Sequence, residues 1–355
     1  MIPPLVSYPS IEAFLATLEE SMRRSRKKNS FFVGTSFDQV REDINVLWKA
    51  GLPPIVSRRA FTVLFGVSPR LIPRMIGSPG IYWRQFQLPK RSGGFRVIQT
   101  PRVFLKTFQL FILQNILAKR ASSTSTYGFT KGRGCFQNAS AHLKKKYVVN
   151  LDIRDFFPSV TYSRVSEIFK QFGFPLEGVE TLTSLCTLNG VLPQGAPTSP
   201  KLADLAFAVA DAELDQVASA HGAIYTRYAD DLTFSFDNVP SSNLVNEVVR
   251  VVDRFGFRLN HDKTRIAGPG QARRVTGFVI NEKVQPSRVT RRQLRAMFHN
   301  MKNDPPASMK DLNVAQGWAS YVNSYNSSLG QGYLTIVRAT REHINEPRNP
   351  ATSPD

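Results

Sequence analysis

The sequence predicts an α+β fold in which a few strands lie among a larger number of helices. Residues 147–153 form a strongly apolar run that ends in a carboxylate, as a buried strand would. Two further strand-like runs, 223–228 and 232–236, are separated by a short turn, as in a hairpin. Most of the remaining chain shows the spacing of amphipathic helices. With 355 residues, 42% of them hydrophobic, the chain can bury a substantial core in one large domain or two or three modest ones.

The charge balance favours a polyanionic partner. Lys and Arg total 46 against 27 acidic residues, which gives a net charge of +19. Nucleic acid is the first candidate and an anionic membrane surface the second. Aromatic residues make up 11% of the chain, which suits stacking on bases and favours nucleic acid.

Other totals exclude several classes of protein. The two cysteines, Cys135 and Cys186, are too few for a disulfide framework or a zinc site. The N-terminus does not resemble a signal peptide, and no apolar run reaches the roughly 18 residues of a membrane span. We therefore expect a soluble, cytoplasmic protein without membrane contact.

Helices dominate both ends of the predicted chain. Residues 10–22 predict a helix with Ser10 as its N-cap, and residues 38–76 predict several short helices. The basic run 23–28 is either a solvated surface or a phosphate contact, and the sequence leaves both open. From residue 290 onward the chain is mostly helical, and the last ten residues read as a frayed tail.

The middle of the chain alternates between strands and helices. Residues 81–99 predict a hairpin whose tip is basic and contains glycine, and a helix follows at 102–119. After the strand at 147–153 the expected elements are helices at 163–172, 179–188, 199–220 and 242–255, with short strands at 258–259 and 275–280. A tight loop at 192–197 precedes the long helix at 199–220.

Three aspartates are the strongest candidates for chemistry. Asp152 ends the apolar strand, and Asp230 and Asp231 lie near the apex of the later hairpin. An isolated pair of aspartates is usually a solvated turn, but flanking apolar strands and a third aspartate argue against that reading. Carboxylates brought this close repel each other, and two Mg²⁺ ions about 4 Å apart would offset the repulsion.

Four segments, in order along the chain, resemble motifs of reverse transcriptases. They are Gly94-Phe95-Arg96-Val97-Ile98, Leu151-Asp152-Ile153-Arg154-Asp155-Phe156-Phe157-Pro158-Ser159, Leu192-Pro193-Gln194-Gly195-Ala196-Pro197-Thr198-Ser199-Pro200 and Tyr228-Ala229-Asp230-Asp231. The resemblance covers roughly residues 80–340 and implies a right-hand polymerase fold, with fingers, an antiparallel palm sheet backed by helices, and a helical thumb. It also implies an RNA-directed DNA polymerase that uses two Mg²⁺ ions, with Mn²⁺ as an alternative, and dNTPs as substrates.

The resemblance assigns roles to individual residues. Asp152, Asp230 and Asp231 would be catalytic and bind metal, with the backbone carbonyl of Ile153 as a further ligand. Phe157 would exclude the ribose 2′-hydroxyl, and Gln194 would approach the incoming nucleotide. Lys90 and Arg96 would contact the triphosphate, although Arg91 could replace Lys90. Lys263 would act as an acid for pyrophosphate or as a phosphate contact.

A narrower resemblance is to bacterial retron reverse transcriptases. Asn138-Ala139-Ser140-Ala141-His142 and Val275-Thr276-Gly277 are similar to two motifs of that group. It implies a cognate noncoding RNA (msr-msd), priming from a 2′-hydroxyl to give a branched RNA–DNA hybrid (msDNA), and antiphage defence with an accessory effector protein. A group II intron-like enzyme, another defence polymerase and a catalytically idle RNA-binding protein stay as alternatives.

These motifs and the basic C-terminal helix are the candidate RNA contacts. Asn138 and His142 are four residues apart, so a helix would place them on one face; a capping Asn and a packed His are the ordinary alternative. Residues 263–302 hold ten Lys or Arg and one acidic residue, Glu282. The full set expected to bind RNA is Asn138, His142, Val275, Thr276, Gly277, Arg288, Arg291, Arg292 and Arg295.

The expected division of the chain follows from the resemblance. Residues 1–80 would form an N-terminal helical part of the fingers, and 81–146 the rest of the fingers with an RNA-contact segment. Residues 147–280 would form the palm with the catalytic site, 281–345 a basic helical thumb, and 346–355 a flexible tail.

Overall fold

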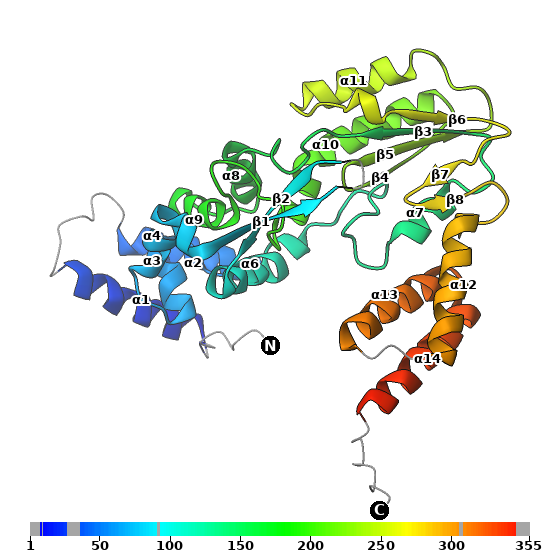
Figure 1. Cartoon of the computed structure of the whole chain (residues 1–355). Coiled ribbons are helices and arrows are strands. Elements are labelled where there is room, and N and C mark those ends of the chain that lie inside the picture. The colour runs from blue at the N-terminus through cyan, green and yellow to red at the C-terminus, as the bar shows by residue number, and fades with distance from the viewer. Residues whose placement is uncertain (1–7, 9, 27–35, 91–92, 305–307, 346–355) are drawn as a thin grey trace, which may run out of the picture.

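The computed structural model describes residues 8, 10–26, 36–90, 93–304 and 308–345. Its N-terminal part is helical, as expected, and these helices lie at one end of the molecule (Figure 1). Ser10 caps the first helix, because the backbone N–H of Ala13 donates to its hydroxyl at 3.3 Å. The helices are α1 (Ile11–Arg26), α2 (Phe37–Lys49), α3 (Arg58–Phe65), α4 (Leu71–Gly77) and α5 (Pro79–Tyr82).

An antiparallel hairpin follows these helices. Strands β1 (Trp83–Pro89) and β2 (Phe95–Pro101) pair along their whole length, and Pro89 lies opposite Phe95 at the tip. Helix α6 (Val103–Asn115) then returns the chain to the main core, with Leu105, Phe108 and Phe111 buried. The predicted hairpin is confirmed, and residues 91–92 at its tip lie outside the described residues.

A four-stranded antiparallel sheet forms the centre of the fold. Its strands are β3 (Tyr147–Asp152), β4 (Ile224–Tyr228), β5 (Asp231–Phe236) and β6 (Arg265–Ala267), in the order β4-β5-β3-β6. Helices α10 (Ser199–Ala220) and α11 (Leu244–Arg254) cover one face (Figure 1). Burying Leu151, Leu232 and Phe234 in this core fixes the register of the strands.

Two further helices and a small sheet complete the central region. Helices α8 (Tyr162–Gln171) and α9 (Leu176–Cys186) pack against each other beside the main core. Helix α7 (Cys135–Ala141) contacts β4 and also the small antiparallel sheet of β7 (Arg274–Val275), β8 (Phe278–Val279) and β9 (Gln285–Pro286). A separate apolar cluster of Ala139, Val148, Val275, Phe278 and Ile280 joins them.

Three C-terminal helices form a core of their own. Helices α12 (Arg288–Asn303), α13 (Met309–Tyr325) and α14 (Ser327–Asn345) lie at the end opposite the N-terminal helices (Figure 1). Leu294, Phe298, Leu312, Val322 and Val337 are buried between them. No helix among the described residues is long and apolar enough to cross a membrane.

The structure differs from the sequence-based expectation in its shortest strands. Residues 258–259 form only a single bridge, from Leu259 to Ile153, and the region 275–280 is two short strands around a turn. Strand β6 was not predicted. Strands of two or three residues carry too little alternation to be recognised in a sequence. The predicted tail at 346–355 and the end of the basic run, residues 27–28, lie outside the described residues.

Candidate active site

The tight turn between β4 and β5 sets the position of two of the aspartates. Tyr228 pairs with Asp231, so the turn itself consists of Ala229 and Asp230. Ala229 has a φ of 57°, a conformation that residues other than glycine rarely adopt. The carbonyl of Asp230 accepts a hydrogen bond from the backbone N–H of Ile153 at 2.8 Å. This bond ties the turn to the end of β3, which carries the third aspartate.

The three aspartates come together at one end of the central sheet. Asp152 and Asp231 are direct partners in the antiparallel pairing of β3 and β5, and direct partners share a face of the sheet. Loss of hydration, together with the charges of Asp230 and Asp152, raises the pKa of Asp231 to about 6, although its side chain still reaches solvent. Burial and the charge of Asp152 also raise the pKa of Asp230. The site therefore holds more negative charge than its surroundings compensate.

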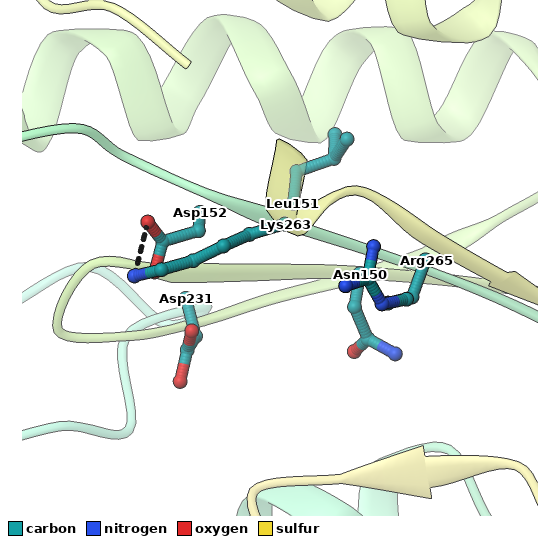
Figure 2. A pocket seen from close by; sticks show the side chains of 6 residues that line it. All are labelled: Asn150, Leu151, Asp152, Asp231, Lys263 and Arg265. Carbon is teal, nitrogen blue, oxygen red and sulfur yellow. Dashed lines mark hydrogen bonds and ion pairs between the residues drawn. The ribbon is translucent and has the colours of Figure 1, made fainter. Parts of the chain in front are cut away.

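Lys263 supplies the nearest positive charge. Its ammonium lies 2.9 Å from both carboxylate oxygens of Asp152 (Figure 2). The hydrogen bonds to Asp152 and the nearby aspartate charges raise the pKa of Lys263. Both residues line a hollow of about 260 Å³, together with Asn150, Leu151, Asp231 and Arg265. Figure 2 shows Asn150 and Asp231 on the side of the strands opposite Leu151.

The donor atoms of this site suit a divalent cation. Among the described residues, no group of three or more His, Cys, Asp or Glu side chains is already arranged around a metal position. Lys263 instead occupies the oxygens of Asp152. Burial and the charges of neighbouring carboxylates raise the pKa values of Asp230 and Asp231, and a divalent cation that prefers oxygen ligands would stabilise their charged forms. The residues present therefore fit such an ion by their chemistry.

A buried arginine that the sequence did not single out lies beneath the turn. Arg227 is 1% exposed, and it donates hydrogen bonds to Asp211 at 2.6–3.1 Å and to Asp204 at 2.9 Å. Its Nη1 also donates to the carbonyl of Ala229 at 3.2 Å. Asp204 and Asp211 are seven residues apart in α10, so both face the sheet. That spacing, two carboxylates on the apolar face of a helix, was the signal available in the sequence.

A loop before α7 supports the same turn and was also missed. Gly128 lies so close to the turn that a Cβ there would be 2.5 Å from the backbone nitrogen of Ala229. The next residue, Phe129, has a φ of 58° and is 59% exposed, and its ring centre lies 6.5 Å from that of Phe157. An exposed aromatic ring in a strained conformation beside the site is a feature of function more often than of packing.

The residues expected to bind a nucleotide surround this end of the sheet. Phe156 is buried in the core, whereas Phe157, which was expected to contact the nucleotide, is half-buried. The carbonyl of Gln194 accepts from the backbone N–H of Gln99 at 2.8 Å. A Cβ on Gly195 would lie 2.8 Å from the side chain of Ile98. The loop of Gln194 is therefore docked directly on β2.

Arg96 and Lys90, the two cations expected to contact the triphosphate, lie at different places on the hairpin. Arg96 is exposed on β2, and its positive charge partly offsets the rise in the pKa of Asp230. It therefore lies within electrostatic range of the aspartates. Lys90 is exposed at the hairpin tip, where its backbone N–H donates to Gly94 at 2.9 Å. Arg91, its possible substitute, lies outside the described residues.

The expectation that Asn138 and His142 contact RNA is wrong for this structure. Their side chains are 1% and 0% exposed. The ring nitrogens of His142 lie 2.6 Å from the hydroxyl of Ser235 and 2.7 Å from that of Thr226. The packed-histidine alternative therefore holds. Asn138 lies within α7 and does not cap it, and its Oδ1 is buried without a hydrogen-bond partner.

The Val275-Thr276-Gly277 segment is largely structural as well. Val275 is 1% exposed, so its side chain cannot contact RNA, which corrects that expectation. The hydroxyl of Thr276 donates to the carbonyl of Cys135 at 2.8 Å, at the start of α7. Gly277 is exposed in the turn between β7 and β8, with a φ of 86°. The two motifs of the narrower resemblance thus pack on each other.

The arginines of α12 lie on the surface as expected. Arg288, Arg292 and Arg295 are exposed, and Arg291 is half-buried. They are far along the chain from the aspartates and stand on the separate C-terminal helices. They remain candidates for binding RNA.

Comparison with known proteins gives a consistent result. Residues 88–283 match the family model of reverse transcriptases (RNA-dependent DNA polymerases). The retron Ec86 reverse transcriptase of Escherichia coli is 31% identical over 306 residues, which cover 85% of this chain and 95% of that protein. The retron Mx162 enzyme of Myxococcus xanthus is 34% identical over 290 residues, 71% of this chain and 60% of its own length. The retron Mx65 enzyme of the same organism is 39% identical over 233 residues, 60% of this chain and 55% of its own.

Among solved structures, two fungal telomerases are distantly similar. Telomerase from Candida albicans, in complex with a fragment of telomeric RNA, has a TM-score of 0.45 at 12% identity, covering 73% of this chain and 54% of that chain. Apo telomerase from Candida tropicalis has a TM-score of 0.41 at 15% identity, covering 58% of this chain and 55% of that chain.

Proposed function

Because the chain belongs to the reverse transcriptases, and among them to those of the retron type, we propose that it copies part of a cognate structured RNA into DNA. The observation that carries this proposal is the meeting of Asp152, Asp230 and Asp231 at one end of the sheet, where Asp152 and Asp231 line a hollow. An idle RNA-binding protein would have no use for three carboxylates gathered at one end of the sheet.

The aspartates have the chemistry to hold two Mg²⁺ ions, with Mn²⁺ as an alternative and the carbonyl of Ile153 as a further ligand. Such ions, when bound, activate the attacking hydroxyl and stabilise the leaving pyrophosphate. The chain's own contribution is to fix the carboxylates through the Ala229 turn and the Ile153–Asp230 hydrogen bond. Lys263 would have to release the oxygens of Asp152 that a metal would take, and its ammonium would then be free to contact phosphate.

The incoming dNTP would lie between the hairpin and the sheet. Arg96 and Lys90 would contact its phosphates, since both are exposed cations on the hairpin. Phe157 would lie against the sugar, where its ring leaves no space for a 2′-hydroxyl. Gln194 would contact the nucleotide from its loop, which is held on β2. The hairpin would then act as fingers (81–146, with 1–80), the sheet as palm (147–280) and the C-terminal helices as thumb (281–345).

We further propose that DNA synthesis starts from a 2′-hydroxyl of the RNA and gives a branched RNA–DNA hybrid. The similarity to three retron reverse transcriptases supports this choice over an intron-type enzyme. A role in antiphage defence with an accessory effector belongs to the same proposal. Deletion of the gene in its native host should then raise phage plaque counts, and restoring it should lower them.

The branched product gives the direct test. The protein is expressed with its flanking genomic DNA, and the nucleic acid that co-purifies is digested with ribonuclease. A retron enzyme leaves DNA that keeps one ribonucleotide at a 2′–5′ branch, which debranching enzyme removes. Linear DNA that extends an ordinary 3′ end would contradict priming from a 2′-hydroxyl. The proposal that the protein is a reverse transcriptase would still stand. The Asp230→Asn variant serves as the control that makes no DNA.

A further inference from the structure

A hollow of about 280 Å³ lies between α12 and the helices α13 and α14. Each liquid water occupies about 30 Å³, so this space suits a group of nucleobase size and is too small for a double helix. Its lining includes Lys283, Arg291 and Arg295 but no acidic residue. Apolar and aromatic walls come from Leu329, Tyr325 and Tyr333.

The positive charges around this hollow lack compensation. Among the described residues, Lys283, Arg291 and Arg295 form no ion pair with a carboxylate. The Nε of Arg291 is buried and has no hydrogen-bond partner. Three like charges around one small space repel each other, and a buried donor without a partner costs free energy. An anion with several acceptor oxygens would relieve both costs.

The aromatic walls are held in place by the surrounding core. The ring of Tyr333 stacks on Phe298 with centres 3.9 Å apart, and Tyr325 packs edge-on against Phe278 at 5.7 Å. Tyr333 is 7% exposed. Rigid rings beside a cationic edge are the combination that binds a base and its phosphate together.

The hollow also opens onto the basic surface of α12. Arg288, Arg291 and Arg295 follow one another at three and four residues, so they lie along one side of the helix, with Arg292 next to them. Arg288 and Arg292 are exposed and do not line the hollow. A phosphate backbone that runs along these arginines would pass the opening of the hollow.

We propose that this hollow holds one unpaired nucleotide of the bound RNA. Its phosphate would contact Arg291, Arg295 and Lys283, and its base would lie against Tyr325 and Leu329. The inference rests on the proposed RNA binding and goes beyond it, because it separates one nucleotide pocket from general contacts to the backbone. It assigns different roles to two pairs of arginines on the same helix.

The test compares a fully paired RNA hairpin with four hairpins of the same stem length that each carry a single-nucleotide bulge, which is A, C, G or U. Affinity for the full-length protein is measured by fluorescence anisotropy. The wild-type protein should bind at least one bulged hairpin about tenfold more tightly, as a base–aromatic contact typically provides.

Matched variants locate the effect. Arg291→Gln/Arg295→Gln should lose the preference for the bulge, whereas Arg288→Gln/Arg292→Gln, with the same loss of charge, should weaken binding of both hairpins equally and keep the preference. Leu329→Trp fills the hollow from its exposed rim without a change in charge, and should abolish the preference while the paired hairpin still binds. Thermal unfolding confirms that each variant is folded.

Two results would contradict the proposal that this hollow binds a nucleotide. One is equal binding of the paired hairpin and all four bulged hairpins by the wild-type protein. The other is a preference for the bulge that survives both Leu329→Trp and Arg291→Gln/Arg295→Gln. Absence of DNA synthesis by the wild-type protein on a primed RNA template would instead contradict the proposed function.

Discussion

Arg227 donates a hydrogen bond from Nη1 to the carbonyl of Ala229 at 3.2 Å, so a fully buried guanidinium holds the turn that carries Asp230. The same side chain is paired with Asp211 and Asp204 and lies over the ring of Phe207 at 5.0 Å. The position of the catalytic turn is therefore coupled to an ion-pair network inside the core.

Replacing Arg227 with Leu should destabilise the protein strongly. It would leave Asp211 buried without its ion-pair partner, which typically costs about 3–5 kcal/mol, whereas Asp204 would keep its ion pair with Lys201. Urea unfolding followed by circular dichroism measures the change. Arg227→Leu combined with Asp211→Asn should recover part of the loss, since the uncompensated charge is then gone. An equal or larger loss in the combined variant would show that charge is not the cause.

Gly128→Ala should lower DNA synthesis with little effect on RNA affinity. The added Cβ would lie 2.5 Å from the backbone nitrogen of Ala229, so the turn must shift, and with it Asp230. Displacement of a catalytic group by a fraction of an ångström commonly costs about 10- to 100-fold in rate. Steady-state incorporation of dNTPs measures this. Gly317→Ala, where no atom lies within 4 Å of the new Cβ, is the control and should be fully active.

Phe157→Ala should let the enzyme insert ribonucleotides. The half-buried ring is replaced by space for a 2′-hydroxyl, so the ratio of kcat/KM for dNTP over rNTP should fall by about 100-fold or more. Single-nucleotide extension with each substrate gives the ratio. An unchanged ratio would remove Phe157 as the residue that excludes the hydroxyl, and Phe129, whose ring lies 6.5 Å away, would be the next to test.

Protonation of the buried His142 should destabilise the folded protein in acid. Burial, reinforced by the charge of Lys145, lowers its pKa to about 4 from the ordinary 6.5. The unfolded chain therefore binds this proton at higher pH than the folded chain does. The stability that neutral His142 contributes is fully present above about pH 6.5 and is lost as the pH falls toward 4, by up to about 3 kcal/mol.

Unfolding in urea at pH 7 and pH 4.5 measures this loss. His142→Gln should be less stable than the wild type at pH 7 but should lose less stability on acidification. His299→Gln, at an exposed histidine of α12, should keep the wild-type dependence on pH. Equal acid sensitivity in all three proteins would assign the effect to other groups.

The sequence predicted the fold and the centre of the site because both depend on local patterns. The α+β class, the hairpin at 81–99 and the pairing of the aspartate strands follow from periodicity, and the similarity to reverse transcriptases confirms the polymerase fold. Asp152 and Asp231 were expected in one site, and their direct pairing across β3 and β5 brings them there.

What the sequence did not predict depends on contacts between distant segments. Arg227 and Asp211 are 16 residues apart in the sequence and meet only because the sheet packs on α10. His142 looked like a surface residue because helical spacing gives its face but not what covers that face, and β4 and β5 cover it. Asn138 and Val275 are buried because α7 packs on the small sheet, a contact between distant segments that the local pattern does not reveal.

DNA synthesis by Asp230→Asn is the most direct measurement of the central claim. Purified wild-type protein and the variant are supplied with a primed RNA template, dNTPs and Mg²⁺, and product is quantified together with RNA affinity. Loss of one carboxylate from the site should lower synthesis by at least about 100-fold, while RNA affinity stays the same. A variant that makes as much DNA as the wild type would contradict the assignment of Asp152, Asp230 and Asp231 as the catalytic centre.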